Sequence, residues 1–348
     1  MPENSSLTCL VTGGAGFIGS HLVDALLADP TVKEVRVLDN FSSGHREFLA
    51  HHAQDSRLKI HEVELLALEK ILPHFAGVDQ IFHLAANPDA RWGLDNTRLD
   101  LEQETLVTYN VLEAMRRHKV PRIVFSSSGT VYGDVGTTVT HELLGPALPI
   151  SLYGAGKVAS EALISAFCST FGLSAIIFRF GNITGERTTH GVVFDFIGQL
   201  VKNSGDLTVL GNGYQAKPYV YVRDLVAGLM FGQKKCAALA PSQFNVFNLA
   251  PGGATNVRFT ANELVAQLGF SVRTKIHYGE SAQGWPGDVP QSRMDSSKLA
   301  QAGFPMPRSS DEAVRLAINR ILHWLAEHPA AAAGLRLPAD AKLAPKIS

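Results

Sequence analysis

The residues TGGAGFIG, which run from Thr12 to Gly19, are the feature that most restricts the fold of this chain. An apolar run, Leu7–Thr12, ends at the first glycines, and apolar residues then recur at helical spacing over Phe17–Ala28. Glycines between a strand and a helix let backbone amides approach a pyrophosphate at the positive end of the helix. The alternative is an ordinary glycine-rich turn. The sequence predicts a strand, a turn and a helix that bind a dinucleotide.

The rest of the first half repeats this alternation. Apolar runs at residues 35–38, 58–63, 80–84, 123–126 and 174–180 are strand candidates, and residues 101–118 and 152–171 have helical spacing. Strands that alternate with helices predict an α/β fold with a Rossmann-type, doubly wound parallel sheet. After Gly181 the chain is punctuated by glycine and proline, which indicates a smaller C-terminal substrate-binding lobe. We expect a dinucleotide-binding domain (1–181 and 217–248), a substrate lobe (182–216 and 249–330) and a flexible tail (331–348).

Composition excludes several classes of partner. The 31 basic residues nearly cancel the 32 acidic ones, so no long-range field favours nucleic acid or an anionic membrane. The sequence has no apolar run of the roughly 18 residues that a membrane span needs. Its three cysteines, Cys9, Cys168 and Cys236, show no pairing or metal-ligand spacing. These observations predict a cytoplasmic protein with a small-molecule ligand.

Asp39 ends the second strand candidate, 20 residues beyond Gly19, where a carboxylate can accept hydrogen bonds from ribose hydroxyls. Because a 2′-phosphate would meet this negative charge, NAD is favoured over NADP; the alternative is a turn-capping aspartate, and both can hold. Glu64 follows the third strand candidate and faces either adenine or solvent. Leu84, Ala85 and Ala86 end the fourth strand candidate, where they leave room for a cofactor or simply pack closely. The expected cofactor contacts are Gly13, Gly16, Phe17, Ile18, Gly19, Asp39, Asn40, Phe41, Ser42, Ser43, Gly44, Glu64, Leu65, Leu84, Ala85, Ala86, Tyr153 and Lys157.

Tyr153 and Lys157 are four residues apart at the start of a helix, which places both on one face. A neighbouring ammonium and the positive nicotinamide ring favour the phenolate, so Tyr153 is a candidate base near neutral pH. The alternative is a surface aromatic beside a solvated lysine. Ser126, Ser127 and Ser128 end the fifth strand, where they could bind a sugar hydroxyl, hold the tyrosine or form a turn.

The segments TGGAGFIG, LDNFSSG, HLAA, FSSSGTVYG, SLYGAGK and RFGNITG, in this order, resemble the extended short-chain dehydrogenase/reductase family, and most closely its UDP-galactose 4-epimerases. The resemblance extends from about residue 7 to about residue 329. The family's separation of 25 residues between serine and tyrosine is kept between Ser128 and Tyr153. It implies that Tyr153 is the base, that Lys157 binds the nicotinamide ribose and that Ser128 is the hydrogen-bond partner.

The same resemblance implies a set of substrate contacts and shows several departures. Trp285 and Lys217 stand where the family has arginines that face phosphate, so Arg187 or Arg293 are alternative partners for a diphosphate. Glu104 stands where the family usually has an asparagine near the cofactor. Ser292 falls at the position that limits pocket size, and a small residue there predicts that N-acetylated hexoses are also accepted. The expected substrate contacts are Ser128, Tyr153, Asn182, Lys217, Asp288 and Ser292.

The resemblance also favours one activity among several. Related dehydratases and decarboxylases carry an acidic residue in the segment that corresponds to residues 128–130, and this chain has none. We therefore expect an NAD-dependent nucleotide-sugar 4-epimerase, and by analogy a homodimer formed through residues 101–118 and 152–171. The alternatives are a net sugar or alcohol dehydrogenase or reductase, a nucleotide-sugar dehydratase, and a non-catalytic NAD sensor. The histidines show no ligand spacing, so no metal is expected.

Overall fold

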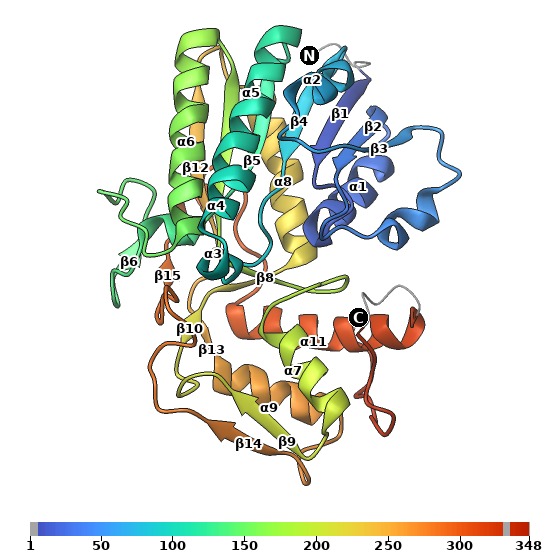
Figure 1. The fold of residues 1–348 in the computed structure, drawn as a ribbon, viewed down its shortest axis with the longest axis vertical. Helices are drawn as coiled ribbons and strands as arrows, with labels where there is room; N and C mark the ends of the chain where they lie inside the picture. Colours follow the sequence, from blue (N-terminus) through green and yellow to red (C-terminus); the bar gives the residue numbers. More distant parts are fainter. Residues whose placement is uncertain (1–5, 330–334, 348) are drawn as a thin grey trace. The chain divides into compact units, whose positions relative to one another are not determined.

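The computed structural model describes residues 6–329 and 335–347, which fall into two compact units (Figure 1). The first unit comprises the chain up to Val131 together with Ser151–Arg179 and Val226–Phe247. The second comprises Tyr132–Ile150, Phe180–Leu225 and the chain from Asn248 onward. The chain therefore crosses between the units several times.

The first unit is built on a seven-stranded sheet with the order β12-β7-β5-β4-β1-β2-β3. Neighbouring strands from β5 through β4, β1 and β2 to β3 run parallel. The non-sequential order confirms the predicted doubly wound fold. Its seventh strand, β12, was not identified from the sequence. The strands are β1 (Leu7–Thr12), β2 (Val32–Asp39), β3 (Leu58–Glu62), β4 (Gln80–His83), β5 (Arg122–Ser128), β7 (Ser174–Phe180) and β12 (Phe244–Leu249).

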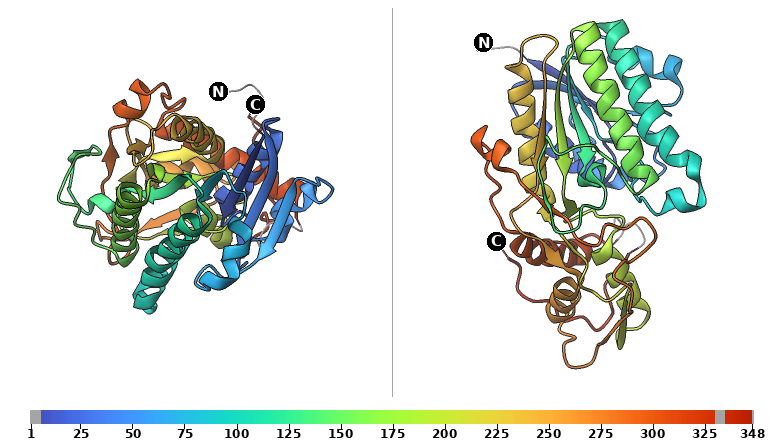
Figure 2. Two further views of the ribbon diagram at one scale, coloured as in Figure 1. Left: turned by 90° about the horizontal axis from the view of Figure 1, so that it is seen from above. Right: turned by 90° about the vertical axis from the view of Figure 1, so that its left-hand side faces the viewer.

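Helices cover both faces of this sheet (Figure 2). One face packs against α2 (Leu68–Ile71), α5 (Val107–His118) and α6 (Leu152–Phe171), in a buried cluster that includes Leu10 and Ile123. The opposite face packs against α1 (Phe17–Ala28) and α8 (Val222–Ala237); Gln233 of α8 donates to Cys9 Sγ of β1. In the part of the chain that the structure describes, no helix is long and apolar enough to cross a membrane.

Local sequence explains why α6 begins and ends where the periodicity predicts. The Ser151 side chain caps its first turn by accepting a hydrogen bond from the Gly154 amide at 3.1 Å. Gly172 ends the helix with φ at +77°, and its amide donates to the Cys168 carbonyl. By contrast, the single helix expected at 101–118 is divided, because residues Leu101–Leu106 form a π-helical segment, η3, before α5.

The second unit has its own buried cluster and short strand pairs. Its core is formed by α7 (Val192–Lys202), α9 (Val257–Gln267) and α11 (Ser310–Glu327) with β9 (Asp206–Val209) and β11 (Tyr219–Tyr221). The remaining elements are β6 (Val139–Thr140), β8 (Asn182–Thr184), β10 (Ala216–Lys217), β13 (Thr255–Asn256), β14 (Lys275–Tyr278), β15 (Arg293–Met294) and α10 (Ser297–Gln301).

Two expected boundaries differ from the observed ones. Residues 132–150, which we placed in the dinucleotide-binding domain, belong to the second unit because β6 pairs with β15 and the Tyr132 hydroxyl donates to Asn248 at 2.7 Å. Residues 217–225 also belong to the second unit, since β11 pairs with β8.

The expected flexible tail is only partly described. Residues 331–334 and 348 lie outside the described residues. Residues 335–347 are held against α9 and α11, because the Ala344 amide donates to the Gln267 carbonyl and the Ile347 amide donates to the Asn319 side chain. Leu335 is buried in the core of the second unit. This part of the tail is therefore packed, in contrast to the prediction.

Candidate active site

The glycine loop between β1 and α1 has the geometry that close approach of a phosphate requires. A Cβ atom on Gly19 would lie 2.1 Å from the Gly13 carbonyl oxygen, so only glycine allows the helix to start this close to the strand. The N-cap residue of α1 is Gly16, which has no side chain to cap the helix, and the first turn carries no carboxylate. The first amides of α1, including those of Phe17, Ile18 and Gly19, have no partner within the helix. They suit an anionic pyrophosphate.

Asp39 lies at the end of β2 beside this loop and is 7% exposed. Its two oxygens accept hydrogen bonds from the Ala15 amide at 2.9 Å and from the Phe41 amide at 2.8 Å. The turn-capping role is therefore confirmed, and Asp39 also ties the turn after β2 to the glycine loop. Burial raises the pKa of Asp39, while the two amide hydrogen bonds and nearby cations act to lower it. Each carboxylate oxygen keeps capacity for a further hydrogen bond, so the ribose contact stays a prediction.

The turn after β2 is organised by Asn40. Its Oδ1 accepts from the amide and hydroxyl of Ser42, and its Nδ2 donates to Glu64 Oε2 at 2.8 Å. Glu64 also accepts from the Leu66 amide, so its carboxylate is already engaged within the protein. The Arg46 guanidinium lies over the Phe41 ring. The contacts of these residues with adenine, and those expected of Ser43, Gly44, Leu65 and Ala86, stay predictions.

Tyr153, Lys157 and Ser128 are brought together at the start of α6 and the end of β5. The Lys157 ammonium lies 5.5 Å from the centroid of the Tyr153 ring and 5.1 Å from that of Phe125. Ser128 Oγ accepts from the amide and hydroxyl of Thr130, which leaves its own hydrogen for the Tyr153 hydroxyl. The structure therefore joins the three residues proposed for catalysis within the first unit.

The charge environment of Tyr153 differs from the expected one. Burial raises the pKa of Tyr153, and the carboxylates of Glu104 and Asp100 act in the same direction. The Lys157 ammonium and the hydrogen bond from Ser128 lower it, as predicted, but they do not outweigh the other effects. The protein without cofactor therefore holds Tyr153 as a neutral phenol at neutral pH.

The three serines of β5 have three different roles. Ser126 Oγ donates to the His83 carbonyl at 3.1 Å, and Ser127 Oγ donates to Glu161 at 2.5 Å. Glu161 in turn pairs with Arg179, with 2.7 Å between Nη2 and Oε2. Ser126 and Ser127 thus connect β5 to neighbouring elements, and Ser128 alone of the three is directed at Tyr153. The sequence could not separate them, because their partners come from other strands and helices.

Glu104 is the acidic residue that the sequence comparison left without a role. Its Oε2 lies 2.7 Å from Lys157 Nζ, and both side chains are 1% exposed. Its Oε1 accepts a hydrogen bond from the Asn87 amide at 2.9 Å. Burial raises the pKa of Glu104. Burial alone would lower the pKa of Lys157, but Glu104, together with Tyr153 and Glu161, acts in the opposite direction, and the pKa of Lys157 lies above its usual value.

A buried hydrogen-bond chain links Glu104 to the end of β1. Thr12 Oγ1 accepts from the amides of Leu84 and Ala85 and must donate to His83 Nδ1, 2.7 Å away. His83 Nε2 then donates to Thr108 Oγ1 at 3.0 Å, and Thr108 donates to the Glu104 carbonyl. Burial lowers the pKa of His83 to about 3, which matches a neutral ring with a single N–H.

The residues expected to contact a substrate beyond Ser128 and Tyr153 lie in the second unit. Lys217 forms an ion pair with Asp288, whose other oxygen accepts from the Gly284 amide. The charge that was expected to face phosphate is therefore offset by a buried carboxylate. Asn182 forms a hydrogen bond with the Tyr219 hydroxyl, and burial raises the pKa of Tyr219 to about 12. The Ser292 amide donates to the Ala216 carbonyl.

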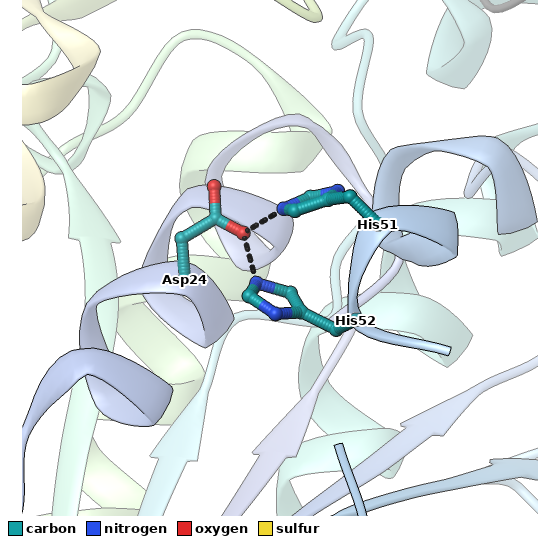
Figure 3. Close-up of side chains that lie close together, drawn as sticks. All are labelled: Asp24, His51 and His52. Carbon is teal, nitrogen blue, oxygen red and sulfur yellow. Dashed lines mark hydrogen bonds and ion pairs between the residues drawn. The ribbon is translucent and has the colours of Figure 1, made fainter. Parts of the chain in front are cut away.

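Two histidines converge on a carboxylate far from Tyr153 in the sequence (Figure 3). Asp24 Oδ1 of α1 lies 2.9 Å from His51 Nε2 and 2.8 Å from His52 Nε2, both at the end of the 3-10 helix η1 (Arg46–His52). Within residues 6–329 and 335–347, this is the one cluster of three such side chains that could hold a metal ion. The two hydrogen bonds to Asp24 tie η1 to α1.

Comparisons with known proteins identify the family of the chain. Residues 9–249 match the model of the NAD dependent epimerase/dehydratase family. A Methanocaldococcus jannaschii protein provisionally named UDP-glucose 4-epimerase is 31% identical over 91% of this chain and 97% of its own. UDP-glucuronic acid decarboxylase 6 of Arabidopsis thaliana is 31% identical over 85% of this chain and 83% of its own. A crystal structure of UDP-galactose 4-epimerase superposes with a TM-score of 0.80 and 34% identity, over 92% of this chain and 99% of that one.

Proposed function

Because the chain belongs to the NAD dependent epimerase/dehydratase family, we propose that it is a nucleotide-sugar 4-epimerase that keeps NAD through each turnover. The observation that carries this proposal is the arrangement of Ser128, Tyr153 and Lys157, in which a serine donates to a phenol beside a buried ammonium. Such a group can take a proton from a sugar hydroxyl and return it. The similarity to a UDP-galactose 4-epimerase over almost the whole chain supports the same activity.

The residues of the first unit fit the cofactor. The glycine loop and the first amides of α1 would hold the pyrophosphate, Asp39 would accept from the adenosine ribose, and Lys157 would bind the nicotinamide ribose. When bound, NAD supplies the hydride acceptor and the positive charge that favours ionisation of Tyr153. The buried carboxylate of Asp39 also explains a preference for NAD over the cofactor that carries a 2′-phosphate.

The protein residues then perform a reversible proton transfer. Tyr153 takes the proton of the hydroxyl on carbon 4 while the hydride leaves that carbon, and Ser128 donates its hydrogen bond to the Tyr153 oxygen. The 4-keto sugar presents either face when the hydride and the proton return, which inverts carbon 4 in some turnovers. Two electrons leave and return within one cycle, so the reaction consumes no external oxidant or reductant.

The segment after Ser128 supports epimerisation over elimination. Gly129 and Thr130 supply no carboxylate, and the Thr130 hydroxyl is already used to orient Ser128. A dehydratase needs an acid–base pair to remove a ring substituent, and residues 128–130 contain no such acid. We therefore place dehydration, decarboxylation and net oxidation among the outcomes that an assay must distinguish.

The substrate contacts are proposals that rest on the second unit. We propose that Asn182 and Ser292 contact the nucleotide sugar and that a diphosphate competes with Asp288 for Lys217. The Lys217 ammonium is a point charge and cannot bind a phosphate through two parallel N–H groups as an arginine does. Affinity for the diphosphate therefore depends on further groups such as Arg293. The small Ser292 side chain supports acceptance of N-acetylhexosamines as well as hexoses.

The test is a proton NMR assay of the purified protein with no added cofactor. UDP-glucose, UDP-galactose, UDP-N-acetylglucosamine, UDP-glucuronic acid and dTDP-glucose are supplied separately, and bound NAD is measured in the denatured protein. We expect bound NAD and interconversion of the 4-epimers of at least one UDP-hexose without accumulation of NADH. Release of CO₂, formation of a 4-keto-6-deoxy sugar, or stoichiometric NADH would replace the proposal by the corresponding activity.

The three cysteines support a proposal for the cellular compartment. Cys9, Cys168 and Cys236 are buried free thiols. Burial raises the pKa of Cys9 and Cys168 to about 12 and that of Cys236 to about 11, so all three stay protonated and unreactive. We propose that the protein works in the reducing cytoplasm.

A further inference from the structure

Glu104 combines three features that an ordinary structural carboxylate lacks. It is as buried as Lys157, it contacts the Lys157 ammonium directly, and it lies on a π-helical segment. Single-turn π-helical segments are rare and often occur at functional sites. Because Lys157 also lies over the Tyr153 ring, a change of charge at Glu104 acts on the proposed base through one intervening group.

The carboxylate is fixed from several directions. Oε2 contacts Lys157 and Oε1 accepts from the Asn87 amide. The backbone carbonyl of Glu104 accepts from Thr108 and Ser160, which anchors the π-helical turn to α5 and α6. A Cβ atom on Gly156 would lie 2.6 Å from Glu104 Cβ, so α6 approaches this turn only because residue 156 is glycine. The carboxylate therefore cannot move away from Lys157 without rebuilding the packing of α6 on η3.

The consequence for Tyr153 follows from the balance of charge. An uncompensated ammonium stabilises a nearby phenolate, and a charge within about 4–6 Å shifts a pKa by about 1–3 units. Here the ammonium is paired, so the field of the ion pair at Tyr153 is weaker than that of Lys157 alone. The remaining groups that face the pair are Asp100 from α4 (Thr97–Asp100), Glu161 from α6 and the neutral His83 from β4.

We propose that Glu104 is a positioning residue that holds Lys157 and offsets its charge, so that the Tyr153–Lys157 pair keeps both protons until a cationic cofactor is bound. The inference rests on the proposed role of Tyr153 as base. It means that the free protein carries an inactive neutral phenol, and that ionisation of Tyr153 is coupled to the presence of oxidised NAD. An amide at position 104 would hold Lys157 in place without this coupling.

Replacement of Glu104 by glutamine isolates the charge. Glutamine keeps the length of the side chain and an oxygen for the Asn87 amide, but it leaves Lys157 uncompensated. The first proton to leave the pair then comes from either Tyr153 or Lys157. Because the two sites are coupled, the first apparent pKa of the pair is lower than in wild type whichever residue loses that proton. The expected effect is a fall of that apparent pKa by about one unit or more.

The measurement is ¹³C NMR of protein labelled at the ζ carbon of tyrosine, titrated from acid to alkaline pH with and without NAD. The Tyr153 signal is assigned by its absence in Tyr153→Phe. Glu102→Gln is the matched control, because Glu102 lies on the same π-helical segment but pairs with the largely exposed Arg98. We expect the first titration step of Tyr153 to move to lower pH in Glu104→Gln and to stay in place in Glu102→Gln.

Two further variants separate the charge at position 104 from the size of its side chain. Glu104→Asn removes the charge with a shorter amide and replaces Glu104→Gln if that protein does not fold, whereas Glu104→Asp keeps the charge and should retain the wild-type titration. The acid limb of the pH profile of kcat should move with the NMR titration. An unchanged titration in folded neutral variants would overturn the proposal. Because the titration uses no sugar, this result is independent of whether the protein proves to be an epimerase.

Discussion

In the proposed reaction, proton transfer depends on the Tyr153 hydroxyl and on the two groups that act on it. Ser128 is oriented by Thr130 and donates to the phenol, and Lys157 lies beside the ring. Tyr153→Phe removes one oxygen and should lower kcat by about 10²–10⁴-fold, the usual contribution of general acid–base catalysis. Bound NAD per protein should not change, since the glycine loop and Asp39 are untouched.

The NMR assay of epimerisation and the NAD content of the denatured protein check this prediction. Tyr109→Phe is the matched control, because Tyr109 is 44% exposed on α5 and has no role in the proposed chemistry. Full activity of Tyr153→Phe, with the control unaffected, would exclude Tyr153 as the base.

His83 makes stability depend on pH. Its pKa falls from 6.5 to about 3 on folding, so between these values the unfolded chain binds a proton that the folded protein does not. The free energy of unfolding should therefore decrease as pH falls below 6.5, by about 1.4 kcal/mol per pH unit from this residue. Urea unfolding of wild type and His83→Gln at neutral and mildly acidic pH tests the effect. The variant should show a shallower slope, and equal slopes would contradict a neutral buried His83.

Some contacts of single residues were predictable from the sequence and others were not. The spacing of Tyr153 and Lys157, one helical turn apart, predicted that they share a helix face, and the family resemblance implied Ser128 as their partner. The partners of Ser127 and Lys217 were not predictable, since Glu161 and Asp288 approach them only in the folded chain. Glu104 was visible as a departure from a family pattern, but only the structure shows that it meets Lys157.

Among the elements, α6 carries Tyr153 and Lys157, two of the three residues proposed for catalysis, and the Ser151 side chain caps its first turn. Ser151→Ala removes the hydrogen bond to the Gly154 amide and should lower the free energy of unfolding by about 1 kcal/mol. Because Tyr153 lies in that first turn, we also expect kcat to fall more than KM changes. Urea unfolding and steady-state kinetics measure the two effects. Ser151→Asp, which retains a capping oxygen, is the control and should behave like wild type; an unaffected alanine variant would contradict the capping role.

Element bounds were predictable where a local signal marks them. The bounds of α1 and α6 agree with the expectation because the glycine loop, Ser151 and Gly172 lie at their ends. The π-helical segment before α5 was not predictable, because apolar periodicity does not distinguish a π turn from an α turn. This segment is held by a long-range contact, since the Ser160 hydroxyl of α6 donates to the Glu104 carbonyl of η3.

One face of the molecule carries exposed apolar side chains on η3, α5 and α6. These three elements pack against one another, and α5 and α6 lie side by side in Figures 1 and 2. Tyr109 and Phe171 are each close to Phe167 and are 44% and 48% exposed; Leu106 is 40% exposed. Clusters of this kind mark protein interfaces, and we predict that this face forms a homodimer. Light scattering after size exclusion should give the mass of a dimer for wild type and of a monomer for Tyr109→Glu. A monomeric wild type would refute the prediction.

The division of the chain into two units was only partly predictable from the sequence. The change from regular alternation to glycine and proline punctuation near Gly181 lies close to the observed start of the second unit's main segment at Phe180. Residues 132–150 carry no such signal, and they join the second unit through long-range contacts to Asn248 and β15. Sequence therefore indicates a second unit but does not identify every segment that belongs to it.

In the proposed reaction a hydride leaves one carbon of a nucleotide sugar beside Tyr153 and returns to the same carbon. Incubation of the purified protein in ordinary water with UDP-glucose that carries deuterium on carbon 4 tests it most directly, with NMR detection of the product. We predict UDP-galactose that retains the deuterium on carbon 4, formed at least about 10²-fold more slowly by Tyr153→Phe. Loss of the deuterium to solvent, or equal conversion by the phenylalanine variant, would contradict the account.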